Sequence, residues 1–541
     1  MQLFLSMAEF LIANLALLAL ALVSSAAWLK GGRALNLLGV LFFYILFISL
    51  AVFVFGCTGW LNAHVMAVAG LVVLGWCLIR GWSLLMAEIG RLKETTVLFH
   101  RELLRHPALL VFFYGFSAWF VVRSVIHVLV LPPYIWDVLT YHLPKVAVWV
   151  QQGSLDCPDT PVVRSFWPAG FELLQAWFAL FWHGDAIIEV PGLLFYGLAC
   201  GSVYVLCRTC GAGVPYSIMG MLFYAATPAL VLHSTCGKND IGVSALFLFV
   251  ASLASSGRER NTSWMPISLL AILLAVGIKA YMIFLLPGLV VLAWPALLAW
   301  KRNHRGAWSV SMPFAVLILF TTAAGSYWYI RNLVAFGNPF YPAVFKLFGS
   351  GMGLQGFEDV QQGSFSLKSL WVILSCLFRE RILDPGILTP NMPGQAGWGW
   401  FAVSIGLPCA VVGLWVRSNY RWLFSGFVLA GLSLMAWITP DLWCLRFFFW
   451  FPALLTVGSI VTLSRIHHLA IRHSVLVIGV VATLLNASAV SSNGYHRMDV
   501  WCRMAALPLK ERSAAILMGG AWESFLNNLP LGVSFTPVLP V

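Results

Sequence analysis

Residues 35–56 read LNLLGVLFFYILFISLAVFVFG, an apolar run that contains no charged side chain. A helix needs about 20 apolar residues to cross a bilayer, and comparable runs recur along nearly the whole chain. The 541 residues are 60% hydrophobic and only 10% charged, whereas soluble domains average about 25% charged residues. Because backbone groups cannot stay unpaired in lipid, the sequence predicts an all-α polytopic membrane protein.

The apolar runs predict about 13–14 transmembrane helices. Three further segments are too polar or too short to cross. Residues 81–107 predict an amphipathic helix on the cytoplasmic membrane surface, 169–182 predict an interfacial helix in the first large outer loop, and 366–377 predict a second interfacial segment. The predicted spans lie near 3–29, 35–56, 61–79, 108–131, 187–207, 215–233, 241–256, 264–279, 281–300, 310–330, 397–416, 422–439, 447–463 and 474–491.

The formal charge of +12 is explained by topology. With these spans, the basic residues within 30–33, 80–105, 258–260, 301–305, 417–421 and 465–472, together with Arg208, all fall on one side, which the positive-inside rule assigns to the cytoplasm. Nucleic acid is therefore not an expected partner. The tail after residue 491 then lies outside. We predict three parts: residues 1–107 with extra N-terminal spans, a catalytic core over 108–464, and 465–541 with the last span and a short tail.

The outer loops carry an unusual set of ionisable and amide side chains at or near span ends. At that depth such groups are costly, and they face a cavity or one another. Acids next to cations favour a substrate with an anionic group such as a phosphate. The candidate residues are Asp137, His142, Arg164, Glu172, Lys238, Asn239, Asp240, Lys279, Arg331, Asn332 and Arg446.

Each candidate also has a purely structural explanation. Asp137 can be a solvated helix cap, and His142 can satisfy a local hydrogen bond. Lys279 interrupts an apolar run and can extend to the membrane surface as a snorkelling lysine. Arg331 and Arg446 can be span-end anchors.

Several stretches resemble the GT-C superfamily of membrane glycosyltransferases, in particular the bacterial relatives of protein O-mannosyltransferases and aminoarabinose transferases. The order of the stretches and their common side of the membrane make the set more specific than any one of them. They are Trp136-Asp-Val-Leu-Thr-Tyr-His-Leu-Pro144, Arg164-Ser-Phe-Trp-Pro-Ala-Gly-Phe-Glu172, Lys238-Asn-Asp240, Gly277-Ile-Lys279, Trp328-Tyr-Ile-Arg-Asn332, Gly337-Asn-Pro-Phe-Tyr341 and Arg446-Phe-Phe-Phe-Trp-Phe-Pro452.

The resemblance implies a GT-C fold and a polyprenyl-phosphate-linked sugar donor. It implies that Asp137 is the first-loop catalytic acid and Asp240 a second functional acid, with Lys279, Arg331 and Arg446 as candidates for the lipid phosphate. The first-loop acid is single, in contrast to the Asp-Glu pair of O-mannosyltransferases. This difference leaves the use of a divalent metal and the acceptor class open; no residue is assigned to a metal and no cofactor is established.

We therefore predict an inverting glycosyltransferase of the bacterial inner membrane with its active site on the outer face. A polyprenyl phosphate leaves readily once cations neutralise it, and the acceptor hydroxyl needs a general base, here Asp137. The acceptor can be a glycan, a lipid or a protein. Two alternatives stay open: a surface-glycan ligase or polymerase using diphosphate lipids, and a transporter or flippase. The latter is expected to show inverted repeats and midplane charges, neither of which is evident.

Overall fold

The computed structural model describes residues 2–29, 31–156, 162–182, 185, 187–257, 264–303, 311–343, 346–347, 350–351, 404–416, 420–437, 446–491, 497–508 and 511–512. Almost all of these residues are helical, and the two short strands pair antiparallel. In chain order the elements are α1 (Gln2–Trp28), α2 (Arg33–Cys57), α3 (Ala63–Ile79), α4 (Trp82–Leu104), α5 (Pro107–Val130), η1 (Val138–His142), α6 (Leu143–Gln152), η2 (Val163–Phe166), α7 (Gly170–Trp182), α8 (Val190–Thr209), α9 (Val214–Ala225), α10 (Pro228–His233), α11 (Asp240–Gly257), α12 (Trp264–Ile278), α13 (Met282–Asn303), α14 (Met312–Phe336), β1 (Lys346–Leu347), β2 (Ser350–Gly351), α17 (Gly406–Ala410), η4 (Val411–Val416), α18 (Arg421–Trp437), α19 (Phe451–Ser464), α20 (Leu469–Ser491) and α21 (Met498–Ala506).

The prediction of an all-helical, multi-pass membrane protein is confirmed. Within the described residues, eight helices are long and apolar enough to cross a membrane: α1, α2, α5, α8, α11, α13, α14 and α20. A bent pair, α3 and α4, gives up to nine, and five shorter apolar helices fall in the remaining predicted ranges. The predicted span at 397–416 begins outside the described residues, and the predicted interfacial segment at 366–377 lies wholly outside them.

The predicted span at 215–233 is divided into α9 and α10. The division falls at Ala226 and Thr227, directly before Pro228. A proline lacks the backbone donor that an uninterrupted helix needs, and it disfavours helical dihedrals in the residue before it. The continuous apolar run concealed this break.

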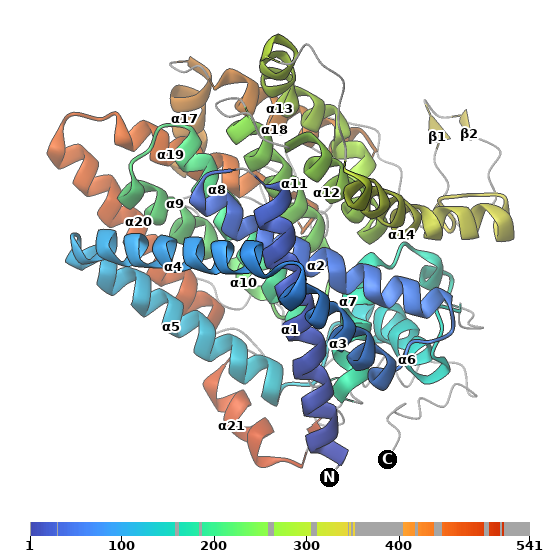
Figure 1. The fold of residues 1–541 in the computed structure, drawn as a ribbon. Helices are drawn as coiled ribbons and strands as arrows, with labels where there is room; N and C mark the ends of the chain where they lie inside the picture. Colours follow the sequence, from blue (N-terminus) through green and yellow to red (C-terminus); the bar gives the residue numbers. More distant parts are fainter. Residues whose placement is uncertain are drawn as a thin grey trace.

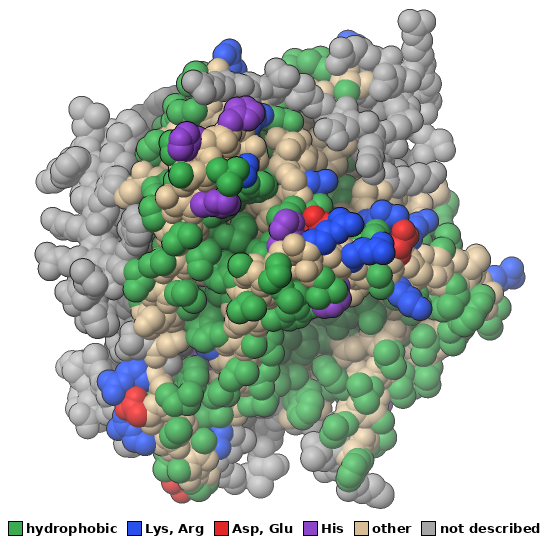
Figure 2. Space-filling model, turned by 90° about the vertical axis from the view of Figure 1, so that its left-hand side faces the viewer, with side chains coloured by type: hydrophobic (Ala, Val, Ile, Leu, Met, Phe, Trp, Pro, Cys, Tyr) green, Lys and Arg blue, Asp and Glu red, His purple; other side chains and the backbone are tan. Residues whose placement is uncertain are grey.

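Helix α4 turns by 86° from the axis of α3. The buried Glu88 carboxylate on α4 accepts hydrogen bonds from Ser25 and Arg91, which fixes the helix against the end of α1. Arg33 at the start of α2 forms an exposed ion pair with Glu94. Figure 2 shows Lys, Arg and His side chains gathered on this face, along α4 and near the start of α20. This arrangement agrees with the predicted amphipathic helix lying along the membrane surface.

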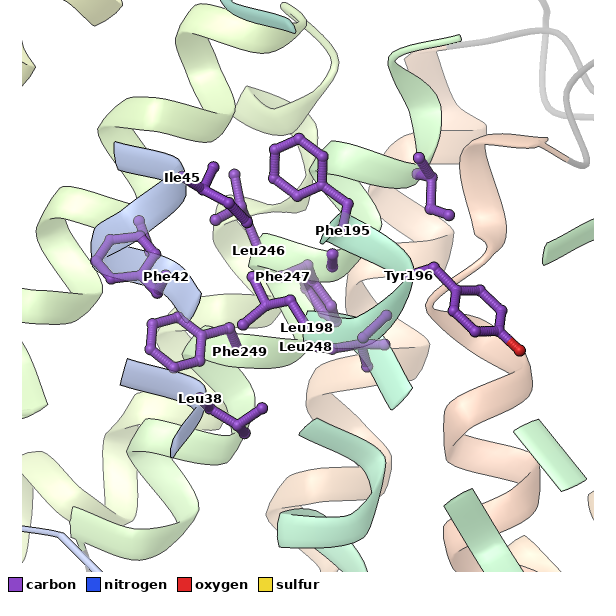
Figure 3. Close-up of a cluster of buried hydrophobic side chains, with 14 of the residues drawn as sticks. Leu38, Phe42, Ile45, Phe195, Tyr196, Leu198, Leu246, Phe247, Leu248 and Phe249 are labelled. Carbon is purple, nitrogen blue, oxygen red and sulfur yellow. The ribbon is translucent and has the colours of Figure 1, made fainter. Parts of the chain in front are cut away.

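Helix α11 lies at the centre of the bundle and is buried over its whole length (Figure 1). It packs against α8, α12, α13 and α2. Figure 3 shows side chains of α2, α8 and α11 interdigitating, and Phe42 of α2 stacks on Phe249 of α11 with ring centroids 4.9 Å apart. A helix that is apolar on every face belongs in such a core. Its first residue, Asp240, is consequently held at a fixed place at one end of the bundle.

Three glycines allow α7, α12 and α14 to approach each other closely, as small residues do in membrane bundles. A Cβ added at Gly170 would lie 2.8 Å from the backbone C and O atoms of Gly277. A Cβ at Gly277 would lie 3.0 Å from the Cα of Gly325. This contact fixes the end of α12 relative to α7. The candidate residues Glu172 and Lys279 follow Gly170 and Gly277 by two positions.

Replacing Gly170 with alanine is expected to destabilise the fold. The new methyl group meets backbone atoms, so α7 and α12 must separate, at about 1–3 kcal/mol for an overpacked contact. Intrinsic tryptophan fluorescence during thermal unfolding in detergent measures the loss. Gly115→Ala on α5 is the matched control, because a Cβ there has nothing within 4 Å. Equal midpoints for the two variants would contradict the contact.

The C-terminal helix α21 packs on α5 and on the segment that follows it. Trp501 of α21 lies in a small apolar cluster with Tyr134 and Val138, which flank Asp137 in sequence. Helix α21 and Asp137 therefore lie on the same side of the bundle. The division at residues 107 and 464 stays a prediction, since α2 packs against both α7 and α8 of the proposed core.

Candidate functional site

Asp137 immediately precedes a single turn of π-helix, η1 (Val138–His142). Pro144 follows two residues after this turn and cannot donate to the carbonyl of Thr140, as an α-helix requires. Instead the backbone N–H of Leu143 bonds the carbonyl of Val138, the i→i+5 pattern of a π-helix. In an α-helix, residues five apart are rotated by about 140° around the axis. The wider turn brings Asp137 and His142 to the same side.

Lys238 reaches Asp137 from the turn before α11. Gly237 has a φ of +70°, a conformation that side-chain-bearing residues rarely adopt. A Cβ at Gly237 would lie 3.2 Å from the side chain of Val138, so this turn packs closely on η1. The Nζ of Lys238 lies 2.8 Å from Oδ2 of Asp137.

Arg446 joins Asp137 to Asp240. Its Nη1 donates to Oδ2 of Asp137 at 3.1 Å, and its Nε lies 3.5 Å from Oδ2 of Asp240. Lys279, in the break between α12 and α13, lies 2.5 Å from Oδ1 of Asp240 and donates to Asn239 at 3.0 Å. The cations of Lys279 and Arg446 both lie over the ring of Phe447, at 4.9 and 5.2 Å from its centroid. Five residues from four separate segments therefore form one charged cluster.

The charged cluster (Asp137, Lys238, Asp240, Lys279 and Arg446) holds two carboxylates and three cations. It therefore carries one positive charge in excess. Asp240 is almost completely buried, and the side chains of Asp137 and Arg446 are each only 16% exposed. A buried excess charge is costly, so the cluster is suited to receive an anion.

A second buried group lies beside the charged cluster. Nδ1 of His142 is 2.8 Å from Oε1 of Glu172, and Nζ of Lys145 is 2.9 Å from the same oxygen. The three side chains are at most 2% exposed. His142 and Asp137 are close enough to interact electrostatically. We call His142, Lys145 and Glu172 the histidine group.

The remaining predicted residues bind backbone groups or aromatic rings. Nη2 of Arg331 and Nδ2 of Asn332 each donate to the carbonyl of Phe166 at 3.0 Å. Asn332 also donates to Tyr341. Arg164 lies 5.3 Å from the centroid of the Trp136 ring, next to Asp137. In the described structure Arg331 and Asn332 thus hold η2 against α14, and a role in phosphate binding stays a prediction for Arg331.

Burial and ion pairing act in opposite directions on the Asp137 carboxyl. Burial raises its pKa, but Lys238 and Arg446 outweigh this effect and hold the pKa below its ordinary value. For Glu172 burial likewise raises the pKa, while Lys145 and His142 lower it, with a net value of about 2. Burial lowers the pKa of His142, and Glu172 only partly offsets this. At neutral pH the two carboxyl groups are therefore anionic and the imidazole is neutral.

The depressed pKa of Glu172 predicts a loss of stability in acid. Its stabilising contribution is fully present above the ordinary value of 4.5 and is lost as the pH falls toward the folded-state value of about 2. The unfolding midpoint of the wild-type chain is expected to fall across this window, and that of Glu172→Gln to fall less. Glu102→Gln, at a more exposed pair with Arg105, is the control and should follow the wild type. Parallel curves for wild type and Glu172→Gln would contradict this prediction.

Metal ligation was left open by the sequence. Among the residues that the structure describes, no three His, Cys, Asp or Glu side chains converge as a metal site does. The carboxylates of Asp137 and Asp240 instead pair with cationic side chains.

Lys145 is the functional candidate that the sequence analysis did not select. It stands in the otherwise apolar helix Leu143-Pro-Lys-Val-Ala-Val-Trp-Val. A lone lysine at a fully buried position signals a specific partner, but the sequence does not name Glu172 as that partner.

No protein-family model matches the chain, and none of the curated proteins matches it. Among solved structures, the chain is similar to an archaeal oligosaccharyltransferase, AglB from Archaeoglobus fulgidus, determined with an inhibitory peptide and a dolichol-phosphate. The two share 13% sequence identity with a TM-score of 0.38, over 75% of this chain and 59% of that one. The chain thus spans less than two thirds of that protein, and this degree of similarity does not assign a family.

Proposed function

We propose that this protein is an inverting membrane glycosyltransferase of the GT-C type. It transfers a sugar from a polyprenyl-phosphate donor to an acceptor hydroxyl at the outer face of the membrane. The observation that carries the proposal is the convergence of Asp137, Asp240 and three cations at the ends of separate helices. Such a site supplies both a carboxylate for the acceptor and cations for a leaving phosphate.

The charge balance favours a monophosphate donor. One excess positive charge matches the phosphodiester of a polyprenyl-phosphate sugar, which carries one negative charge. A diphosphate lipid adds a second negative charge that the cluster leaves without a cation. Arg446 and Lys279 are our candidates for the phosphate oxygens, because guanidinium and ammonium groups stabilise the charge that develops on a leaving phosphate.

Asp137 is the proposed base for the acceptor hydroxyl. Paired with Lys238 and Arg446, it holds a proton poorly in the free protein. A donor phosphate that binds Arg446 weakens the hold of this arginine on Asp137, so the carboxylate becomes a better base when the donor is present. Asp240 is proposed to keep Lys279 and Asn239 in place and to position the sugar or the acceptor.

The position of the charges argues against a transporter or flippase. In such proteins, functional charges lie near the bilayer midplane on interrupted helices. Here Asp240 is the first residue of its helix, and Lys279 and Arg446 lie outside the helices next to them. These helix-end positions support our proposal that the cluster lies near one membrane boundary, where a lipid headgroup lies.

The test is donor cleavage by the purified full-length chain in liposomes of phosphatidylethanolamine and phosphatidylglycerol. Sugar-labelled polyprenyl-phosphate and polyprenyl-diphosphate donors are compared. Because the natural acceptor is unidentified, water serves as a slow substitute acceptor in this assay. We expect release of label from the monophosphate donors alone, with inversion at the anomeric carbon. Cleavage of diphosphate donors alone favours the ligase alternative. Movement of labelled lipid across the bilayer without cleavage favours a flippase, and either result overturns the proposal.

A further inference from the structure

Glu172 fixes which nitrogen of His142 carries the proton. A carboxylate can only accept hydrogen bonds, so Nδ1 of His142 must be the donor across the 2.8 Å contact with Oε1. Lys145, 2.9 Å from the same oxygen, keeps Glu172 anionic. In the neutral ring the lone pair is then on Nε2. Among the described residues, no hydrogen-bond donor engages this nitrogen.

The π turn brings this imidazole within electrostatic range of the proposed base. Asp137 and His142 are five residues apart and lie on the same side of η1, and each affects the charge of the other. Single π turns occur frequently at functional sites. An α-helical turn would have rotated His142 away from Asp137. The irregular turn therefore has a consequence for the site beyond accommodating Pro144.

We propose that His142 receives the acceptor proton from Asp137 during sugar transfer. This inference rests on the proposed function. Asp137, flanked by Lys238 and Arg446, accepts the proton as the acceptor oxygen bonds to the anomeric carbon. The bond from that carbon to the phosphate oxygen breaks, and the phosphate keeps the electron pair. The proton passes to Nε2 of His142, Glu172 stabilises the resulting imidazolium, and the proton then leaves to water.

The groups facing His142 are consistent with this role. Glu172 on α7 favours the imidazolium, whereas Lys145 on α6 disfavours it. Asp137 favours it, and Tyr141 packs against the ring with centroids 4.3 Å apart. The balance leaves the ring neutral before the reaction and provides an adjacent anion for the cation that forms. This is the arrangement by which an acidic side chain orients a histidine base in hydrolytic triads.

The first experiment does not require turnover. Nitrogen-15 NMR of the histidine-labelled full-length chain in liposomes reports the tautomer and charge of each ring, and loss of one signal in His142→Gln assigns His142. At pH 7.5 we expect a neutral ring protonated at Nδ1, with a shift toward the Nε2-protonated form in Glu172→Gln. In Asp137→Asn the pKa of His142 is expected to fall, because a neighbouring anion has been removed. His64 on α3, which is exposed and paired with Glu9 of α1, serves as the control and should be unaffected.

A ring that is protonated at Nε2 in the wild type, or a His142 titration that Asp137→Asn leaves unchanged, overturns the proposal.

The second experiment follows donor cleavage against pH. The acidic limb of the wild-type profile is expected to disappear in His142→Gln, with a rate loss of about 10²-fold or more, whereas His64→Gln keeps the wild-type profile. An unchanged profile in His142→Gln also overturns the proposal. If the wild-type chain cleaves no polyprenyl-phosphate donor, the proposed function fails while the NMR result still decides the state of His142.

Discussion

Asp137→Asn is expected to slow donor cleavage by about 10²–10⁴-fold, the usual contribution of a general base. Asparagine keeps the size of the side chain but cannot take a proton. It also removes the charge that pairs with Lys238 and Arg446, so the lipid phosphate should bind at least as tightly as in the wild type. The measurements are the cleavage rate at saturating donor and the binding of undecaprenyl phosphate to liposomes that contain the variant.

The control for Asp137→Asn is Asp499→Asn on α21. Asp499 lies on the same side of the bundle, and its ion pairs with Arg497 and Arg503 are exposed. It should retain the wild-type rate within about twofold, since exposed pairs contribute little. Wild-type cleavage by Asp137→Asn removes Asp137 from the base role. A loss of rate together with a loss of phosphate binding assigns it to donor binding instead.

Arg446→Gln is expected to affect both stability and binding. Arg446 pairs with the two carboxylates of the charged cluster at once, and its removal leaves two lysines to balance two buried anions. Breaking a buried ion pair costs about 3–5 kcal/mol. The excess positive charge is lost as well, so binding of undecaprenyl phosphate should weaken by about 10²-fold or more, as for a buried charge pair in an interface.

Arg503→Gln on α21 is the matched control, because its side chain is 70% exposed and pairs only with an exposed aspartate. Its unfolding midpoint and phosphate binding should equal those of the wild type. Arg446→Lys separates the effect of the charge from the effect of the contact geometry, since a lysine keeps the positive charge but cannot contact both carboxylates as the guanidinium does. Normal phosphate binding by a folded Arg446→Gln variant would exclude Arg446 as a phosphate ligand.

Much of the architecture follows from local sequence. Runs such as 35–56 specify helices because lipid leaves the backbone no other way to satisfy its polar groups. The positions of the rare ionisable residues at span ends could also be predicted, since each had to lie near the boundary or find a partner. The break at Pro228 and the sharp bend between α3 and α4 interrupt apolar runs, and hydropathy alone does not show them.

The partner of each charged residue was decided by the tertiary structure. Asp137 and Arg446 are 309 residues apart, and their contact depends on how the intervening helices pack. Lys145 could not be distinguished from a surface lysine until Glu172 on α7 was placed beside it. Composition and hydropathy show which side chains are costly to bury, because that cost depends on the chemistry of the side chain and on its position relative to the spans. Helix packing decides which charged side chains neutralise one another. Ion pairs form only over a few ångströms, and the distance between two residues in the sequence does not reveal their distance in space.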